Sequence, residues 1–294
     1  MAPKTVRMGK FSIELTNPDK IMYPESGITK QDVIRYYKRI APVMLPHIRG
    51  RPLVMHRFPD GIEGEDFYQK SAPDYFPEWI KRKKVRLKEG GSEYLVVVTR
   101  AADLVYLANQ ACLVPHVWLS REEDVAKPDK LIFDLDPSGD DFGEVKFAAL
   151  ELKKVLEDED LTPLIMTTGS KGLHVTVPIK PARSFDGVRE FAAKIAGRLT
   201  EESPDRLTTE SRKDKRTGRL LLDVMRNAYG QTSVVPYALR ALPEAPVAAP
   251  LDWNELGNAD LGPRRYTLNN IFRRLGRKKD PWADMFRNRN KLPI

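Results

Sequence analysis

The feature that most constrains the fold is an ordered change of apolar periodicity between about residues 130 and 225. Short apolar runs with a two-residue period predict strands, and apolar residues three and four positions apart predict amphipathic helices. In chain order the pattern predicts a strand at 131–136, a helix around 145–155, strands at 164–168 and 173–177, a helix around 188–199 and a strand at 220–225. The order β-α-β-β-α-β is that of a ferredoxin-like or RRM-like sheet, so the predicted class is α/β (α+β).

Two acidic residues end the first predicted strand, Asp134 and Asp136. Alternation along a strand places both carboxylates on one face, with Cα atoms about 7 Å apart. In this topology the first strand lies between the third and the fourth, so the pair would neighbour His174 on one side and Asp223 on the other. An Asp before a Pro-Ser-Gly turn can instead only cap the backbone. The three carboxylates together favour Mg²⁺ or Mn²⁺, which prefer oxygen ligands.

A glycine-bearing turn, Gly169-Ser-Lys-Gly-Leu-His174, joins the two middle strands. It could be only a hairpin connection. Alternatively, the amides of Ser170 and Gly172, the Lys171 ammonium and the His174 imidazole would surround a triphosphate. Phosphate donors beside a metal site predict nucleotidyl transfer, in which two ions would activate the attacking hydroxyl and stabilise the leaving pyrophosphate.

Basic residues exceed acidic ones, 49 against 41, and the formal net charge is +8. Many of them crowd two stretches. The members are Lys81, Arg82, Lys83, Lys84, Arg86 and Lys88 in one stretch and Arg212, Lys213, Lys215, Arg216 and Arg219 in the other. Either cluster alone could be a solvated hairpin, but together they favour binding to the phosphate backbone of DNA or RNA.

The single cysteine, Cys112, excludes an internal disulfide framework and a cysteine-rich zinc site. No apolar run approaches the roughly 18 residues that a membrane span needs, and the first ten residues lack a signal-peptide core. We therefore expect a cytoplasmic, nucleoid-associated protein with no membrane partner.

The sequence divides into three predicted parts that we expect to form one compact unit. Residues 1–125 form an N-terminal mixed α/β module, residues 126–240 the catalytic core, and residues 241–294 a proline-rich wrap and basic C-terminal segment. Within the first part the pattern predicts a strand at 11–15, a helix at 30–45 capped by Thr29, a hairpin at 79–99 and a helix at 102–113.

Five segments in a fixed order also carry a resemblance that covers nearly the whole chain. They are Leu15-Thr-Asn-Pro-Asp-Lys20 with Tyr23-Pro24, Val43-Met-Leu-Pro-His-Ile-Arg-Gly-Arg-Pro52, Asp134-Leu-Asp-Pro137, Gly169-Ser-Lys-Gly-Leu-His174 and Pro236-Tyr-Ala-Leu-Arg240. With them the chain resembles the polymerase domain of the bacterial and archaeal end-joining DNA ligase D, in the archaeo-eukaryotic primase superfamily. The resemblance implies a primase-like catalytic core packed against the N-terminal module.

The resemblance also implies roles for individual residues. Asp134, Asp136 and Asp223 would be the catalytic metal ligands; His116, Thr168, Ser170, Lys171, His174, Arg226 and Arg240 would bind the nucleotide; Lys20, Lys30, His56, Phe67 and Lys70 would bind DNA. Lys20 and Lys30 match positions that grip a 5′-phosphate, and Phe67 matches an aromatic that stacks near the template. Thr168 stands where members commonly have serine, and His56 where some have lysine.

The activity implied by the resemblance is template-dependent nucleotide addition that fills gaps and extends ends in non-homologous end joining, often with a preference for ribonucleotides and manganese. The substrates would be NTPs or dNTPs with two Mn²⁺ or Mg²⁺ ions. The partners would be DNA ends or gaps with a 5′-phosphate, the Ku protein, and a DNA ligase and phosphoesterase. Those last modules have no room in 294 residues, so we expect either a free-standing polymerase or a domain of a larger chain.

Three other interpretations remain at this stage. A replicative primase catalytic subunit would share the carboxylate triad but usually has a cysteine-rich zinc element, which one cysteine cannot supply. A manganese-dependent glycosyltransferase would use the Asp-x-Asp pair without the basic clusters. A non-catalytic DNA-end scaffold would not need three repelling carboxylates side by side.

Overall fold

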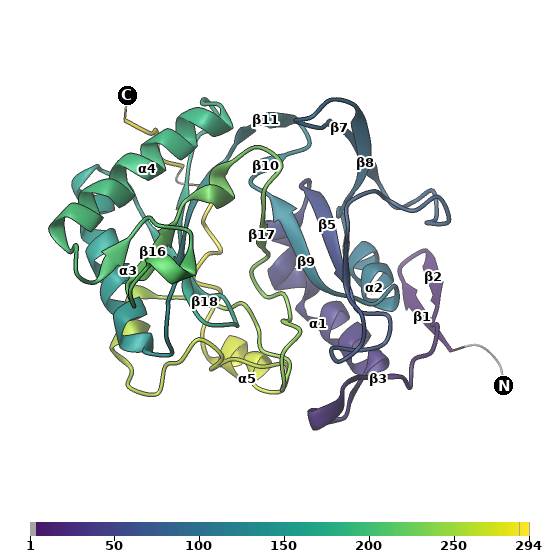
Figure 1. Ribbon diagram of the computed structural model, residues 1–294. Helices are drawn as coiled ribbons and strands as arrows, with labels where there is room; N and C mark the ends of the chain where they lie inside the picture. Colours follow the sequence, from purple (N-terminus) through teal and green to yellow (C-terminus); the bar gives the residue numbers. More distant parts are fainter. Residues whose placement is uncertain (1–3, 288, 294) are drawn as a thin grey trace.

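Two six-stranded sheets form the two halves of the molecule in the computed structural model, which describes residues 4–287 and 289–293. One sheet has the strand order β15-β16-β12-β14-β13-β18, and the other has the order β17-β9-β5-β8-β7 with β6 paired to β5. Figure 1 shows the first sheet with α3 and α4 on one side of the molecule, and the second with α1 and α2 on the other. We call the first the catalytic sheet, after the catalytic core predicted for that part of the sequence, and the second the N-terminal sheet.

The catalytic sheet confirms the predicted β-α-β-β-α-β order. Its elements are β12 (Lys130–Asp136), α3 (Phe142–Asp158), β13 (Leu164–Thr167), β14 (Leu173–Pro178), α4 (Phe185–Glu202) and β16 (Leu220–Asp223). As predicted, β12 lies between β14 and β16. The last strand is shorter than the predicted 220–225, because the Asp223 carboxylate accepts a hydrogen bond from the Met225 amide and the chain turns into a short 3₁₀ helix.

Successive side chains of β12 point alternately into the core of this half and to the open face of the sheet. Leu131, Phe133 and Leu135 are fully buried beneath the apolar faces of α3 and α4. Burying one such side chain contributes about 1.5–3 kcal/mol. The intervening residues, including Asp134 and Asp136, therefore point to the face of the sheet that the helices leave open.

The N-terminal sheet is assembled from segments that are far apart in the sequence. Its elements are β5 (Pro52–Arg57), β6 (Phe67–Gln69), β7 (Arg82–Arg86), β8 (Ser92–Val97), β9 (Cys112–Trp118) and β17 (Thr232–Val234), with α1 (Lys30–Ile48) and α2 (Ala101–Asn109). A reciprocal capping box of Thr29 and Asp32 begins α1, as the sequence predicted. The prediction of a helix at 102–113 is wrong at its end: Ala111 adopts a left-handed conformation (φ 58°), and Cys112 already begins β9.

Smaller elements complete the fold. They are β1 (Thr5–Met8), β2 (Phe11–Glu14), β3 (Ile21–Tyr23), β4 (Ile28–Thr29), β10 (Ser120–Arg121), β11 (Asp124–Pro128), β15 (Leu207–Thr208), β18 (Pro250–Leu251) and α5 (Ile271–Arg277), besides the short 3₁₀ helices Pro24–Ser26, Lys213–Lys215, Met225–Asn227 and Trp253–Gly257. Over residues 4–287 and 289–293, none of the helices has the length and apolar character needed to cross a membrane.

The chain crosses between the two halves more than once. Strand β17 pairs with β9 in the N-terminal sheet, and β18 then pairs with β13 in the catalytic sheet. A buried ion pair also joins the halves, with Arg51 Nη2 at 2.6 Å from Asp129 Oδ1. The boundaries 1–125, 126–240 and 241–294 stay a prediction, because these crossings tie the three parts together.

Candidate active site

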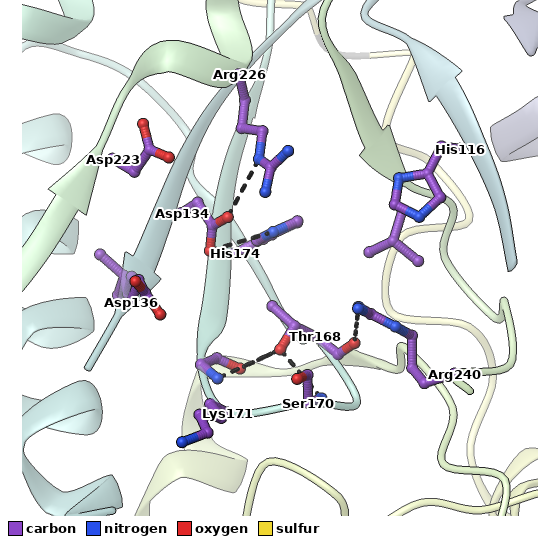
Figure 2. Close-up of a pocket in the computed structure, with 13 residues that line it drawn as sticks. His116, Asp134, Asp136, Thr168, Ser170, Lys171, His174, Asp223, Arg226 and Arg240 are labelled. Atoms are coloured by element: carbon purple, nitrogen blue, oxygen red, sulfur yellow. Dashed lines mark hydrogen bonds and ion pairs between the residues drawn. The ribbon is translucent and has the colours of Figure 1, made fainter. Parts of the chain in front are cut away.

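A cavity of about 250 Å³ lies at the open face of the catalytic sheet and reaches the N-terminal sheet. Figure 2 shows the side chains that line it. They include all the residues predicted to bind metal or nucleotide: His116, Asp134, Asp136, Thr168, Ser170, Lys171, His174, Asp223, Arg226 and Arg240. The structure therefore brings residues from β9, β12, β14, β16, the 3₁₀ helix Met225–Asn227 and two loops to one place.

Strand register explains how the carboxylates meet. Asp134 on β12 lies directly opposite His174 on β14 and directly opposite Asp223 on β16. Residues in such cross-strand pairs have Cβ atoms about 4.5–5.5 Å apart. The neighbours that the sequence predicted for Asp134 are thus the neighbours that the structure has.

Cationic side chains balance two of these carboxylates. The Asp134 carboxylate lies 3.5 Å from His174 Nε2 and accepts a hydrogen bond from Arg226 Nε at 3.3 Å. Asp136 accepts a hydrogen bond from Arg216 Nη1 at 2.9 Å. Burial raises the pKa of Asp134, but His174 and Arg226 outweigh burial and lower the pKa to about 2. Asp134 is therefore a carboxylate at neutral pH.

The candidate metal ligands are supported by the chemistry of their side chains and not by an arrangement that already surrounds an ion. Across the described ranges, 4–287 and 289–293, no three His, Cys, Asp or Glu side chains are arranged to hold a metal ion. Asp136 faces the buried Arg216, and Asp223 accepts a hydrogen bond from the Met225 amide. Three carboxylates around one cavity nevertheless fit Mg²⁺ or Mn²⁺, whose charge would replace that of the arginines.

The turn after β13 is shaped by Thr168. Its hydroxyl donates to the Gly172 carbonyl oxygen at 3.0 Å and accepts from the amides of Ser170 and Gly172, both at 3.3 Å. A Cβ atom at Gly172 would lie 1.9 Å from the Leu135 carbonyl oxygen, so only glycine allows this close approach to β12. The two predicted phosphate-binding amides are thus engaged by Thr168 here, while the half-exposed Lys171 side chain lies 3.6 Å from Asp140.

The opposite wall of the cavity is formed by His116 and Arg240. Arg240 Nη1 donates to the Thr168 carbonyl oxygen at 2.8 Å, as Figure 2 shows. Burial, followed by the charges of Arg240 and Arg226, holds the pKa of His116 well below its ordinary value. Among the described residues His116 Nε2 is a buried atom without a hydrogen-bond partner. A neutral imidazole with an unpaired nitrogen is suited to a polar ligand.

Lys20 and Lys30 lie outside this cavity, in a group of cations. Lys20 Nζ pairs with Asp60 Oδ1 at 2.6 Å, and the buried Lys30 Nζ donates to the Thr16 carbonyl oxygen at 2.7 Å. Burial, together with the charges of Lys20 and Arg57, lowers the pKa of Lys30 to about 8. Sequence reasoning missed Arg57, because no motif marks an arginine at the end of β5.

The other predicted DNA-binding residues follow β5 and β6. His56 pairs with Asp66 at 2.6 Å and stacks on Tyr68 with ring centroids 4.0 Å apart. Phe67 is 43% exposed, with the Arg57 guanidinium over its ring. Lys70 lines a second cavity of about 510 Å³ that Arg86, Lys88 and Trp118 also line. Tyr68, which no sequence motif singled out, also packs against His116 of the first cavity, with ring centroids 5.7 Å apart.

Comparison with known proteins identifies the fold. The family model described as the primase-polymerase domain of LigD matches residues 29–282. A multifunctional non-homologous end joining protein LigD of Mycolicibacterium smegmatis is 36% identical over 86% of this chain and 34% of its own length. The bifunctional LigD of Bacillus subtilis is 32% identical over 96% of this chain and 45% of its own length. The chain thus spans less than half the length of these curated relatives.

A solved structure has the same fold as this chain. The polymerase domain of Mycobacterium tuberculosis ligase D, in complex with DNA, superposes with a TM-score of 0.88 and 32% identity, covering 95% of this chain and 99% of that one. The mixed α/β class and the resemblance found in the sequence are confirmed, and with them the class of DNA-directed nucleotidyltransferases. The chain belongs to the LigD primase-polymerase domain family.

Proposed function

We propose that this chain is a template-dependent nucleotidyltransferase that fills gaps and extends DNA ends in non-homologous end joining. One observation carries the proposal: Asp134 lies between Asp223 and His174 in the strand register, in a cavity that Lys171 and Arg240 also line. Carboxylates for a metal ion and cations for phosphates are the two requirements of nucleotidyl transfer. The end-joining role comes from the printed names of the relatives.

In this proposal each group around the cavity has a defined task. The Lys171 ammonium, the Arg240 guanidinium and the turn at 169–172 bind the triphosphate, and the neutral His116 donates or accepts a hydrogen bond beside it. Asp134, Asp136 and Asp223 would hold two Mn²⁺ or Mg²⁺ ions, which when bound supply charge neutralisation and lower the pKa of the attacking hydroxyl. The 3′-oxygen of the primer forms a bond to the α-phosphorus of the nucleotide, while the bond from that phosphorus to the leaving pyrophosphate breaks.

DNA would follow the surface outside the cavity. Lys20, Lys30 and Arg57 form a group of cations suited to a terminal 5′-phosphate. Phe67 and the stacked pair of Tyr68 and His56 offer aromatic faces for template bases. Arg86, Lys88 and Lys70 around the second cavity extend the positive surface, and the M. tuberculosis neighbour was solved with DNA bound.

Several finer properties belong to the same proposal. A preference for ribonucleotides, the use of manganese and the presence of two ions follow from the family resemblance. Ku, a DNA ligase and a phosphoesterase would be partners, either as separate proteins or as modules of one chain, because the relatives are named as multifunctional or bifunctional. Association with the nucleoid would follow from DNA binding.

A non-catalytic DNA-end scaffold is the second candidate. The observation that favours it is the pairing of Asp134 with Arg226 and of Asp136 with Arg216, which neutralises two carboxylates without a metal. Such pairs can serve stability alone.

Primer extension on a short gapped duplex with a 5′-phosphate separates the two candidates. Ribonucleotides and deoxyribonucleotides are compared in Mn²⁺ and in Mg²⁺, with Asp134→Ala as the inactive control. We expect templated addition by the wild-type chain that the substitution abolishes. Tight binding to DNA ends with no addition under any condition would favour the scaffold.

A further inference from the structure

Three buried tyrosines hold the segment 236–240, which carries Arg240. The contacts are Tyr36 Oη donating to the Tyr237 carbonyl oxygen (2.7 Å), the Leu239 amide donating to Tyr37 Oη (3.2 Å) and Tyr23 Oη donating to the Arg240 carbonyl oxygen (3.1 Å). Burial raises the pKa of all three phenols, so each keeps its proton at neutral pH. The N-terminal part of the chain thus fixes the last segment of the predicted catalytic core.

Arg240 has little freedom apart from these contacts. Its amide donates to the Pro246 carbonyl oxygen at 2.7 Å, and its guanidinium donates to the Thr168 carbonyl oxygen at 2.8 Å. Its side chain also packs against Gly169, where an added Cβ would lie 2.8 Å from Arg240 Cγ. A hydrogen bond to the carbonyl oxygen of Arg240 therefore acts on the position of a guanidinium that lines the nucleotide cavity.

Tyr23 differs from the other two tyrosines in where it lies. It ends β3, which begins one residue after Lys20, and the Lys30 amide donates to the Lys20 carbonyl oxygen at 2.8 Å. Ile21 of β3 also pairs with Thr29 of β4, immediately before Lys30. The two lysines therefore flank the small β3–β4 hairpin that carries the Tyr23 hydroxyl.

We propose that Tyr23 is a positioning residue that couples the 5′-phosphate site to the nucleotide site. A phosphate bound by Lys20 and Lys30 fixes the β3–β4 hairpin, and the Tyr23 hydroxyl passes that restraint to the main chain of Arg240. Nucleotide binding then costs less ordering when a 5′-phosphate is present, and the coupling is reciprocal. The inference rests on the proposed function and adds to it a route between two of its sites.

The test compares the KM for the nucleotide on two gapped duplexes that differ only in a 5′-phosphate or a 5′-hydroxyl. The wild-type chain should have the lower KM on the phosphorylated gap. The KM ratio is the KM on the hydroxyl-ended gap divided by the KM on the phosphorylated gap. Tyr23→Phe removes one hydroxyl, and we expect it to lower this ratio by about threefold to tenfold, the effect of one hydrogen bond. The value of kcat should change much less than KM.

Tyr237→Phe is the matched control, because Tyr237 lies in the same segment but its hydroxyl bonds to Asp280 in the C-terminal part. Its ratio should equal that of the wild type, even if its KM rises on both gaps. A wild-type ratio in Tyr23→Phe would overturn the inference. An equal fall of the KM ratio in both variants would also overturn it, because greater mobility of the segment 236–240 would then explain the result without any coupling.

A second comparison keeps the test independent of any loss of stability in Tyr23→Phe. In a chain that already carries Lys20→Met and Lys30→Met, adding Tyr23→Phe should leave the remaining KM ratio unchanged, and a further fall would contradict the coupling. Failure of the proposed function is visible separately, since the wild-type chain would then add no nucleotide to either gap.

Discussion

The two sheets contribute different groups to the same cavity, and the strands that carry these groups are spaced differently along the chain. In the catalytic sheet Asp134, His174 and Asp223 are cross-strand neighbours within one β-α-β-β-α-β unit. In the N-terminal sheet the pocket-lining His116 and Val234 come from strands more than a hundred residues apart. The acidic groups therefore depend on one local topology, whereas the recognition surface depends on packing of the whole chain.

The sharpest way to test this division is to remove a carboxylate from the catalytic sheet. Asp223→Ala should reduce nucleotide addition by at least about 1000-fold, because the proposed metal site loses one of three oxygen donors. Affinity for gapped DNA in metal-free buffer should stay within about twofold, since the proposed DNA-binding residues lie outside the catalytic sheet. Rates come from primer extension and affinities from fluorescence anisotropy.

Asp186→Ala is the control for this prediction, because Asp186 is an exposed carboxylate in the first turn of α4. It should leave both quantities unchanged. Loss of DNA binding in Asp223→Ala would mean that the two sheets do not divide catalysis and recognition as proposed.

The next largest effect is expected at the buried ion pair of Arg51 and Asp129, which joins the two halves of the molecule. Arg51 is 0% exposed and Asp129 is 2% exposed by side chain. Arg51→Met leaves a buried carboxylate whose one remaining ion-pair partner among the described residues is Arg121, so the free energy of unfolding should fall by about 3–5 kcal/mol. Urea unfolding followed by tryptophan fluorescence measures the change.

The exposed pair of Arg35 and Asp32 provides the comparison, and Arg35→Met should cost less than about 1 kcal/mol. We expect a single transition in the wild-type chain and in both variants. Two separated transitions in the wild type would show that the sheets unfold as independent units.

The same contrast explains what could be predicted from the sequence. Alternation in β12 and the topology of one unit were enough to place Asp134 beside His174 and Asp223. No local sequence pattern predicts that Arg216, in a loop, contacts Asp136, because that contact depends on how the loop packs. The basic residues of that stretch were visible as a cluster, but not the buried position of this one.

The N-terminal sheet was less visible for a related reason. Its strand β6 has only three residues, too few for a periodic signal, so the stacking of Tyr68 on His56 could not be inferred. The end of α2 was misplaced because the left-handed backbone at Ala111 leaves no mark in the apolar pattern. Likewise, β15 and β18 are two-residue strands that extend the catalytic sheet beyond the predicted unit.

A smaller effect is expected at the cation group of Lys20, Lys30 and Arg57. Replacing Lys20 and Lys30 by methionine should weaken binding to a phosphorylated gap by about 10- to 100-fold, because two charge-assisted contacts to phosphate are lost. Binding to an otherwise identical hydroxyl-ended gap should change by less than about threefold. Competition anisotropy with the two duplexes measures both values.

Two exposed lysines, Lys38 on α1 and Lys194 on α4, supply a control with the same change in net charge. Their double replacement by methionine should weaken binding to both duplexes by the same factor. If the Lys20 and Lys30 variant bound both duplexes more weakly by the same factor, the assignment of a 5′-phosphate site would be wrong.

The smallest predicted effect is a pH dependence of phosphate recognition. Burial and the charges of Lys20 and Arg57 lower the pKa of Lys30 to about 8 in the free protein. A bound phosphate favours the charged ammonium, so the pKa in the complex is higher, and affinity for the phosphorylated gap is constant below about pH 8 and falls above it. Between pH 7 and 9 the expected loss is up to about tenfold.

The phosphate itself adds little to this slope, since its second ionisation, with a pKa of about 6, is nearly complete at pH 7. Lys30→Met should therefore flatten the profile, because a methionine side chain has no proton to lose, and the hydroxyl-ended gap should show the same flat profile with the wild-type chain. A profile in the variant as steep as that of the wild type would assign the titration to another group. The lysine whose pKa burial lowers would then not be the source of the pH dependence of DNA-end recognition.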